Sequence, residues 1–341
     1  MKRSTAGLPE EDLISACTDI DKVREFYANR EILIYGATGF IGTWLTSSLL
    51  YANQTLGLNS KIKIITRNSQ AALERFGKEI QNHYVHQHDL SASVPSEVFT
   101  ADLIFHGATP SRKSTGSDNG DALISSTLNA ARHAVSVKSR NIDRPHVVHL
   151  NSGAIYGKQI TRLRSENDLP TTLESNPYIE SKLGADEILS KAELKGLIDF
   201  QSPRLFAFGG PLLPLDEHFA IGNFLANGLQ NQKIEVQGNP GTTRSYMYPA
   251  DLVKILLLLP SFQTKDPINI GSEASITMSD LAELISNLTS RKGVYFSNPK
   301  TEINHYVPST SNLNTLFRGS KITPIETLLE KWIEWLELRS P

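Results

Sequence analysis

The chain has 341 residues, of which 39% are hydrophobic and 21% are charged, and its formal net charge is −2. It is long enough to bury a substantial core, and its charge gives no electrostatic reason to expect nucleic acid or a membrane surface as a partner. Cys17 is the only cysteine, which excludes an internal disulfide and a cysteine zinc site and fits a reducing compartment. The first residues lack the apolar core of a signal peptide, and the apolar run at 255–259 is too short to span a bilayer, so we expect a cytoplasmic protein.

Residues 1–29 precede the first predicted strand and are predicted to be an N-terminal extension. Within them, the segment DIDKVREFYANR places Ile20, Val23, Phe26 and Tyr27 on one face of a helix. We expect this helix to pack on the domain that follows.

A glycine-rich turn joins a predicted strand to a predicted helix. Residues 32–35 form an apolar run typical of a buried parallel strand, and apolar residues recur at helical spacing after the turn. Between the two, Gly36 permits a tight turn, Gly39 lets the backbone approach a pyrophosphate, and Gly42 lets the helix pack closely on the strand. The free N–H groups at the helix start favour an anion. An ordinary strand-to-helix turn is the alternative, but the flanking strand and helix favour a dinucleotide site.

The end of the second predicted strand, at 61–66, bears on which dinucleotide is bound. Enzymes that prefer NAD usually carry Asp or Glu about 20 residues after the glycines, but there is no acid between Thr43 and Leu73. Arg67 stands in that region instead, and a guanidinium group suits a 2′-phosphate. We therefore predict NADP as the cofactor, with NAD as the alternative. In that alternative Arg67 is an ordinary surface residue.

Short strands are also predicted at 84–90, 102–108 and 146–150, with helical stretches such as 123–135 between them. This alternation predicts an α/β protein built on a doubly wound parallel sheet. Asp89 ends one of the strands, where it would either bond the adenine amino group or cap a turn. The three histidines nearby lack acids at ligand spacing, so no metal site is predicted; they are His83, His86 and His88.

The segment 151–182 carries the candidate catalytic group. Tyr178 and Lys182 are four residues apart on a helix expected to start at 176–177, so they share a face. A neighbouring ammonium stabilises a phenolate and makes proton exchange with a sugar hydroxyl feasible near neutral pH. Ser152, at a strand end, would hydrogen-bond the same oxygen, and Lys182 would also hold the nicotinamide ribose. If the Tyr/Lys pair is considered alone, the alternative is that the two residues lie on a helix surface and have no catalytic function.

The chain contains, in this order, the glycine turn, the strand-end serine and the Tyr/Lys pair. By this combination and order, the chain resembles the extended short-chain dehydrogenase/reductase family that works on nucleotide-sugars. The likeness runs from about Glu31 to Ile285 and includes SGAIYG at 152–157 and TRSYMYPADL at 243–252. Residues 219–251 look like the corresponding part of UDP-glucuronate decarboxylases. The resemblance implies a Rossmann domain, a nucleotide-diphosphate sugar as the substrate and a homodimer.

The resemblance also implies binding residues. Arg244 would clamp the diphosphate of the substrate, unless it forms an interdomain ion pair. Ser152 and Asn223 would contact the substrate as well. The residues expected at the cofactor, including those given above, are Gly36, Thr38, Gly39, Phe40, Ile41, Gly42, Arg67, Asp89, Leu90, Gly107, Ala108, Thr109, Tyr178 and Lys182.

Departures from the family pattern bear on the reaction. Sugar 4,6-dehydratases and UDP-glucuronate decarboxylases carry an acid two places after the serine, where this chain has Ala154, and Ala207 replaces an asparagine that helps hold the substrate in many relatives. Because alanine moves no proton, we predict an epimerase, in which Tyr178 moves the proton and a transient ketosugar is reduced on its other face. The alternatives are an NADPH-dependent 4-ketosugar reductase, a 4,6-dehydratase or decarboxylase, and a non-catalytic dinucleotide-binding sensor.

Two interlocked regions are predicted beyond the extension. A dinucleotide-binding domain covers 30–210 and is rejoined by 244–272, and a smaller C-terminal α/β lobe for the nucleotide-sugar covers 211–243 and 273–341. The reason is that 211–215 breaks the alternation, whereas INIG at 268–271 restores a strand, which we expect in the main sheet.

Overall fold

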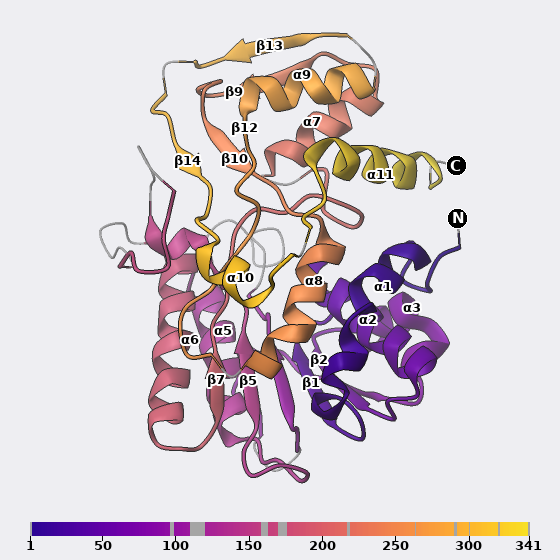
Figure 1. Ribbon diagram of the computed structural model, residues 1–341, viewed down its shortest axis with the longest axis vertical. Helices are drawn as coiled ribbons and strands as arrows, with labels where there is room; N and C mark the ends of the chain where they lie inside the picture. The colour runs from indigo at the N-terminus through magenta and orange to yellow at the C-terminus, as the bar shows by residue number, and fades with distance from the viewer. Residues whose placement is uncertain are drawn as a thin grey trace. The chain divides into compact units, whose positions relative to one another are not determined.

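The computed structural model in Figure 1 forms two compact units. The first contains Met1–Ile155, Thr172–Arg204 and Val253–Pro267, and the second contains Tyr156–Thr171, Leu205–Leu252 and Ile268–Pro341. In the part of the chain that is described, no helix is both long enough and apolar enough to cross a bilayer. The described residues are 2–95, 99–109, 120–157, 163–169, 176–216, 219–262, 264–289, 292–299, 301–319 and 321–339.

The first unit is built on a six-stranded sheet in which every neighbouring pair is parallel. Its strand order is β3-β2-β1-β4-β5-β7, so the order reverses between β1 and β4, and the predicted doubly wound sheet is confirmed. In such sheets ligands bind at the carboxyl ends of the strands, next to that switch point. The strands are β1 (Glu31–Tyr35), β2 (Lys61–Thr66), β3 (Tyr84–Gln87), β4 (Leu103–His106), β5 (His146–His149) and β7 (Asp199–Gln201).

Helices cover this sheet, and two of them, α5 and α6, run side by side (Figure 1). Small residues on these two helices let them pack closely on the apolar strands. One core cluster joins Leu33, Ile104 and Val147 of the sheet to Ala130, Ala134, Ala185 and Leu189 of the helices. The helices of this unit that follow β1 are α2 (Phe40–Leu56), α3 (Ser69–Phe76), η2 (Gly77–Ile80), α5 (Gly120–Ser136), α6 (Pro177–Leu194) and η5 (Leu259–Phe262).

The N-terminal extension belongs to the first unit but is not the single helix that was expected. It forms α1 (Glu10–Cys17), which packs on α2, and a 3-10 segment η1 (Ile20–Phe26) interrupted at Val23, where φ is −122°. The expected apolar contacts still occur, because Ile20 and Tyr27 are fully buried. The Tyr27 hydroxyl donates to the carbonyl of Leu257 at 2.5 Å, which ties the extension to the unit.

The second unit contains short strands and four helices of its own among the described residues. A three-stranded sheet has the order β12-β10-β14, and a two-stranded sheet pairs β9 with β13. The elements are α7 (Ala220–Leu229), β9 (Ile234–Gln237), β10 (Thr243–Ser245), β12 (Ser275–Thr277), α9 (Met278–Leu288), β13 (Val294–Ser297), β14 (His305–Tyr306), α10 (Ser311–Leu316) and α11 (Ile325–Glu337); α8 (Pro249–Leu258) divides between the units.

The prediction that residues 268–271 form a strand of the main sheet is wrong. β11 (Asn269–Ile270) lies outside the six-stranded sheet, and the N–H of Phe206 donates to the carbonyl of Ile270 within the second unit. The buried Asn269 amide also bonds within the second unit, where it donates to the carbonyls of Arg164 and Ser309 at 2.9 and 3.1 Å. The boundary at 244–272 is therefore not supported. The assignment of one region to the dinucleotide and another to the sugar stays a prediction.

Candidate active site

The glycine-rich turn has the shape that the sequence predicts. Gly36 has φ +79°, and a Cβ atom there would lie 2.8 Å from the carbonyl oxygen of Gly107. A Cβ on Gly42 would lie 2.0 Å from the carbonyl oxygen of Gly36. Gly39 is the N-cap of α2, and no side chain caps this helix among the described residues. The first-turn N–H groups are thus available to an anion, so the turn fits the pyrophosphate of a dinucleotide.

The residues after β4 meet this turn at the switch point of the sheet. The N–H of Gly107 donates to the carbonyl of Tyr35 at 3.0 Å, which continues the pairing of β4 with β1. Ala108 is buried, and the hydroxyl of Thr109 accepts from that of Thr127 on α5 at 3.5 Å. The predicted cofactor residues in the turn itself are half-buried or exposed, and these are Thr38, Gly39, Phe40 and Ile41.

The two residues expected near the adenosine lie at the ends of neighbouring strands. Arg67 directly follows β2 and is exposed. Asp89 accepts from the N–H of Ser91 at 2.9 Å. This bond lowers the pKa of the carboxyl group against burial, and the Ser91 side chain and then the charge of Arg67 add smaller contributions in the same direction. Asp89 therefore caps a turn, which was one of the two expected roles. Leu90, the next residue, is buried, and its carbonyl accepts from the Asn129 amide at 3.1 Å.

The structure brings the three candidate catalytic side chains together. Helix α6 begins where predicted, because the Asn176 side chain caps it by accepting from the N–H of Tyr178 at 2.9 Å. Lys182 lies one turn further, with Nζ 5.7 Å from the centre of the Tyr178 ring and donating to the carbonyl of Leu150 at 2.7 Å. Ser152 ends β6 (Asn151–Ser152), and its hydroxyl hydrogen-bonds the Tyr178 hydroxyl.

Burial sets the protonation of this group. It raises the pKa of Tyr178, and the hydrogen bond with Ser152 opposes that rise. Burial also lowers the pKa of Lys182 to about 8, against the opposing charge of Asp186. At neutral pH Tyr178 is thus a phenol that can donate a proton, and Lys182 is a cation close to losing its own.

The position two residues after Ser152 bears no proton-transfer group. Ala154 lies in the 3-10 segment η4 (Gly153–Tyr156), and its N–H donates to the Ser152 hydroxyl at 3.2 Å. The contact holds the serine oxygen but supplies no acid or base.

Polar residues that sequence reasoning missed lie beside Lys182. Asp186 accepts from the Asn151 amide and from the Ser202 hydroxyl, both at 2.5 Å. The rings of His106 and His149, on β4 and β5, lie 4.6 Å apart between centroids, and burial lowers the pKa of both, so they are neutral. The spacing of Asp186, four residues after Lys182, was the one signal in the sequence that could have found this cluster.

The predicted substrate residues Arg244 and Asn223 lie in the second unit. Arg244, on β10, donates from Nη1 to the carbonyls of Thr243 and Asn304 at 2.9 and 3.1 Å, and its guanidinium carbon lies 5.8 Å from the centre of the Tyr306 ring. It forms no ion pair with any residue in the described ranges, so its charge is uncompensated there. Asn223 is exposed on α7.

Other candidate sites are weaker. No group of His, Cys, Asp and Glu able to hold a metal ion occurs among the residues the structure describes. His86 stacks between Tyr84 and His88, with ring centroids 6.1 Å from each.

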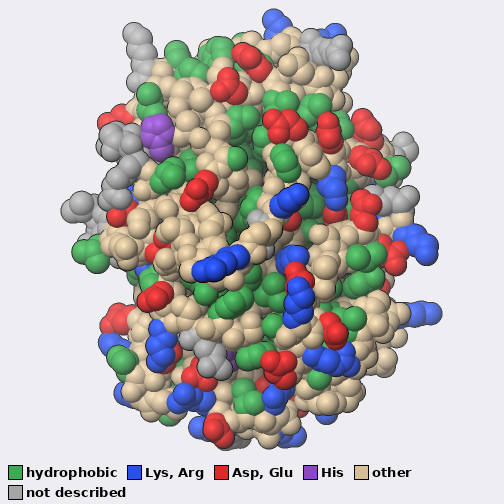
Figure 2. All heavy atoms as spheres, viewed as in Figure 1, with side chains coloured by type: hydrophobic (Ala, Val, Ile, Leu, Met, Phe, Trp, Pro, Cys, Tyr) green, Lys and Arg blue, Asp and Glu red, His purple; other side chains and the backbone are tan. Residues whose placement is uncertain are grey.

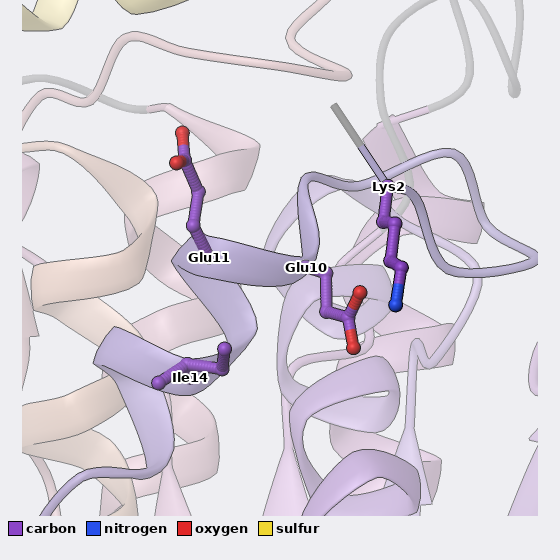
Figure 3. Close-up of a pocket in the computed structure, with 4 residues that line it drawn as sticks. All are labelled: Lys2, Glu10, Glu11 and Ile14. Carbon is purple, nitrogen blue, oxygen red and sulfur yellow. The ribbon is translucent and has the colours of Figure 1, made fainter.

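A pocket on the N-terminal extension, shown in Figure 3, is lined by Lys2, Glu10, Glu11 and Ile14, and none of the predicted site residues lines it. On the face in Figure 2 basic and acidic side chains are interspersed, which matches the small net charge.

The first unit therefore defines a class, the Rossmann-like α/β proteins that carry a glycine-rich turn and a Ser/Tyr/Lys group in one unit. The family model for the NAD dependent epimerase/dehydratase family matches residues 32–271, which is more than half of the chain. The chain belongs to this family, and the prediction of an enzyme of the extended short-chain dehydrogenase/reductase type is confirmed.

Named relatives agree with the family. The chain is 27% identical over 273 residues to UDP-glucuronic acid decarboxylase 6 of Arabidopsis thaliana, an alignment that covers 77% of this chain and 75% of that one. An epimerase from Methanothermobacter thermautotrophicus has a similar structure, with a TM-score of 0.77, 20% identity and coverage of 94% of this chain and 96% of its own. A UDP-N-acetylglucosamine 4-epimerase from Methanobrevibacter ruminantium, in complex with UDP-N-acetylmuramic acid, has a TM-score of 0.76, 21% identity and coverage of 92% and 100%. These structural likenesses concern the fold.

Proposed function

We propose that this chain is an NAD(P)-dependent enzyme that modifies a nucleotide-diphosphate sugar through a ketosugar, and that the reaction is an epimerisation. The observation that carries the proposal is the convergence of Ser152, Tyr178 and Lys182 in the unit that holds the glycine turn. The family and the UDP-sugars in the names of its relatives support the class of substrate.

Each residue has a chemical role in this proposal. A nicotinamide cofactor, when bound, would supply hydride transfer at the sugar carbon. Tyr178 accepts the hydroxyl proton in its phenolate form as the carbonyl forms, and as the phenol it gives the proton back, while Ser152 holds the same oxygen by a hydrogen bond. Lys182 carries positive charge one helical turn away, which favours the phenolate, and holds the nicotinamide ribose.

Ala154 favours epimerisation over water elimination, because elimination needs an acid and a base at adjacent carbons. A 4-ketosugar reductase is the second candidate, and Arg67 favours it, since a guanidinium at the adenosine end suits NADPH. A 4,6-dehydratase or a decarboxylase requires another side chain to replace the acid absent at 154. A non-catalytic sensor need not keep Ser152, Tyr178 and Lys182 together.

The test is incubation of the purified protein with UDP-glucose, UDP-N-acetylglucosamine and UDP-glucuronic acid, each with oxidised or reduced NAD and NADP. Products are identified by mass spectrometry and NMR. Epimerisation gives an isomer of unchanged mass that keeps its 6-hydroxyl, without net cofactor turnover. A 4-keto-6-deoxysugar identifies a dehydratase, loss of carbon dioxide a decarboxylase, and stoichiometric consumption of NADPH with a 4-ketosugar a reductase. Dinucleotide binding with no product from any sugar favours a sensor.

For the cofactor we propose NADP, with Arg67 at its 2′-phosphate. Arg67→Ala should weaken NADP binding by about 10- to 100-fold, the value of a hydrogen bond to a charged group, and leave NAD binding unchanged. Titration of the intrinsic fluorescence with both dinucleotides measures this. Arg144→Ala is the matched control, because Arg144 is an exposed arginine just before β5, at the amino edge of the sheet. Equal weakening of both dinucleotides contradicts the assignment.

We further propose that Arg244 clamps the substrate diphosphate and that Asn223 contacts the substrate, in a homodimer located in the cytoplasm. Arg244→Lys keeps the charge but loses the planar fork of donors, so UDP should bind more weakly. Isothermal titration with UDP checks this, with Arg318→Lys, an exposed arginine of the same unit, as the control. Unchanged UDP affinity removes Arg244 from the site.

A further inference from the structure

One face of α6 contacts the three consecutive residues 150–152, which directly follow β5. Tyr178, Lys182 and Asp186 are spaced by four residues, so they form a row along the helix. Tyr178 hydrogen-bonds the Ser152 hydroxyl, Lys182 donates to the carbonyl of residue 150, and Asp186 accepts from the side chain of residue 151. Asp186 is thus the third member of the row that holds the two candidate catalytic residues.

Asp186 is bonded on both carboxylate oxygens. Oδ2 accepts from Nδ2 of Asn151 and Oδ1 accepts from the Ser202 hydroxyl, each at 2.5 Å, and Asn151 Nδ2 also lies 3.2 Å from that hydroxyl. The other end of the Asn151 amide accepts from the N–H of Ser152 at 2.7 Å. Contacts therefore run without a break from the carboxylate to the backbone of Ser152.

The charges around Lys182 are few. Asp186 contributes the negative charge that opposes the effect of burial on the pKa of Lys182. Burial raises the pKa of Asp186 itself to about 6, against the hydrogen bond from Ser202 and the charges of Arg204 and Lys182, so the carboxyl group is mostly ionised at neutral pH. The side chain of Asp186 is 24% exposed, and its Oδ1 lies 4.0 Å from Nε2 of His149. Burial lowers the pKa of His149, and of its neighbour His106, so both imidazoles are neutral. The carboxylate is consequently the anion that faces the buried ammonium from within the same helix.

We propose that Asp186 is a positioning residue, whose carboxylate fixes Asn151 and the backbone of Ser152 and keeps Lys182 protonated beside Tyr178. The inference rests on the proposed function, in which Ser152, Tyr178 and Lys182 carry the chemistry. The proposal adds a residue that need not contact the sugar or the dinucleotide. It assigns to this residue two effects that can be measured separately, one on the position of Asn151 and Ser152 and one on the protonation of Lys182.

Asp186→Asn tests both effects with little change in volume. In Asp186→Asn one of the two acceptor oxygens becomes an NH2 donor, so the two donors that now bond separate oxygens cannot both be accepted in place, and the side chain carries no charge. Turnover should fall by roughly 10- to 100-fold, as expected when a reacting group is displaced by a fraction of an ångström to an ångström, while KM changes little. The loss of activity at high pH should also move to lower pH, because removal of the carboxylate lowers the pKa of Lys182 further.

Two further variants separate geometry from charge. Ser202→Ala removes one hydrogen bond and keeps the carboxylate, so turnover should fall modestly without a shift of the alkaline limb. Glu187→Gln is the matched control, since Glu187 is the next residue on the helix and pairs with Lys191 at the surface. It should leave both the rate and the pH profile unchanged. Circular dichroism and thermal melts show whether each variant is folded.

The measurements use whichever UDP-sugar of the panel is converted, and an NMR titration of Lys182 in lysine-labelled protein, assigned with Lys182→Met. A lower Lys182 pKa in Asp186→Asn, with the shifted profile, supports the proposal. The proposal is overturned if a folded Asp186→Asn protein keeps the turnover rate, the pH profile and the Lys182 pKa of the wild type while Tyr178→Phe is inactive. Full activity of Tyr178→Phe means instead that the proposed function has failed, and the NMR titration still decides whether Asp186 acts on Lys182.

Discussion

Replacement of Tyr178 by phenylalanine should lower turnover by roughly 10²- to 10⁴-fold, the usual contribution of general acid–base catalysis. The ring remains and only the hydroxyl is lost, so the capping of α6 by Asn176 and the packing of the helix are retained. Cofactor affinity should therefore stay close to that of the wild type. A fall in kcat with nearly constant KM and dinucleotide affinity is the pattern of a group that acts on the reacting hydroxyl.

Two comparisons make this result specific. Tyr84→Phe makes the same chemical change at an exposed tyrosine on β3 and should leave turnover unchanged. Lys182→Met should lower both turnover and cofactor affinity, because Lys182 is assigned to the phenol and to the nicotinamide ribose. Steady-state kinetics and dinucleotide titrations measure both effects. Full activity in Tyr178→Phe would move the acid–base role to another group.

The pH dependence of turnover follows from the same group. Burial lowers the pKa of Lys182 to about 8, so the protonated form is lost as the pH rises through that value. Turnover should then decline on the alkaline side at a lower pH than an ordinary lysine would give. A profile of kcat against pH checks this, and Lys182→Arg, which stays charged, should remove the decline in whatever activity it keeps.

The parts of the fold that sequence could predict are those whose information is local. The strand at 31–35, the turn after it and the helix from Phe40 depend on residues within one stretch, and the start of α6 depends on the adjacent Asn176 and Pro177. Alternation of such segments then implies the parallel sheet. The convergence of Ser152 with Tyr178 could be anticipated in the same way, because a strand end and the following helix meet at one edge of the sheet.

Features that depend on tertiary contacts could not be read from the pattern. The apolar segment around Asn269 has the composition of a sheet strand, but it lies outside the main sheet and its amide bonds two carbonyls that are distant in sequence. The helical periodicity at 20–27 was real, yet the chain kinks at Val23 while keeping Ile20 and Tyr27 buried. Asp186 looked like an ordinary helix residue, because its partner Ser202 lies beyond the end of the helix.

Gly42→Ala should disrupt the dinucleotide site more than any other single-methyl change in the turn. The added Cβ would lie 2.0 Å from the carbonyl oxygen of Gly36 and 2.8 Å from the Cα of Ala37, so helix α2 must move away from the turn. Overpacking of this kind costs about 1–3 kcal/mol of stability, and the displaced N–H groups no longer meet the pyrophosphate. We expect a lower melting temperature together with at least a roughly tenfold loss of affinity for both NAD and NADP, since a displaced anion contact to charged groups is worth about 1.5 kcal/mol or more.

A glycine at the other end of the same helix provides the control. Gly57 has φ +60°, and a Cβ there would have no neighbour within 4 Å, so Gly57→Ala adds backbone strain without a clash. It should lower the melting temperature through a cost of about 1–2 kcal/mol, yet leave dinucleotide affinity unchanged. Thermal melts and fluorescence titrations of the two variants separate a loss of binding from a loss of stability. If Gly42→Ala binds NAD and NADP as tightly as Gly57→Ala does, close approach of α2 to the turn is not what the cofactor requires, and the pyrophosphate must be held elsewhere.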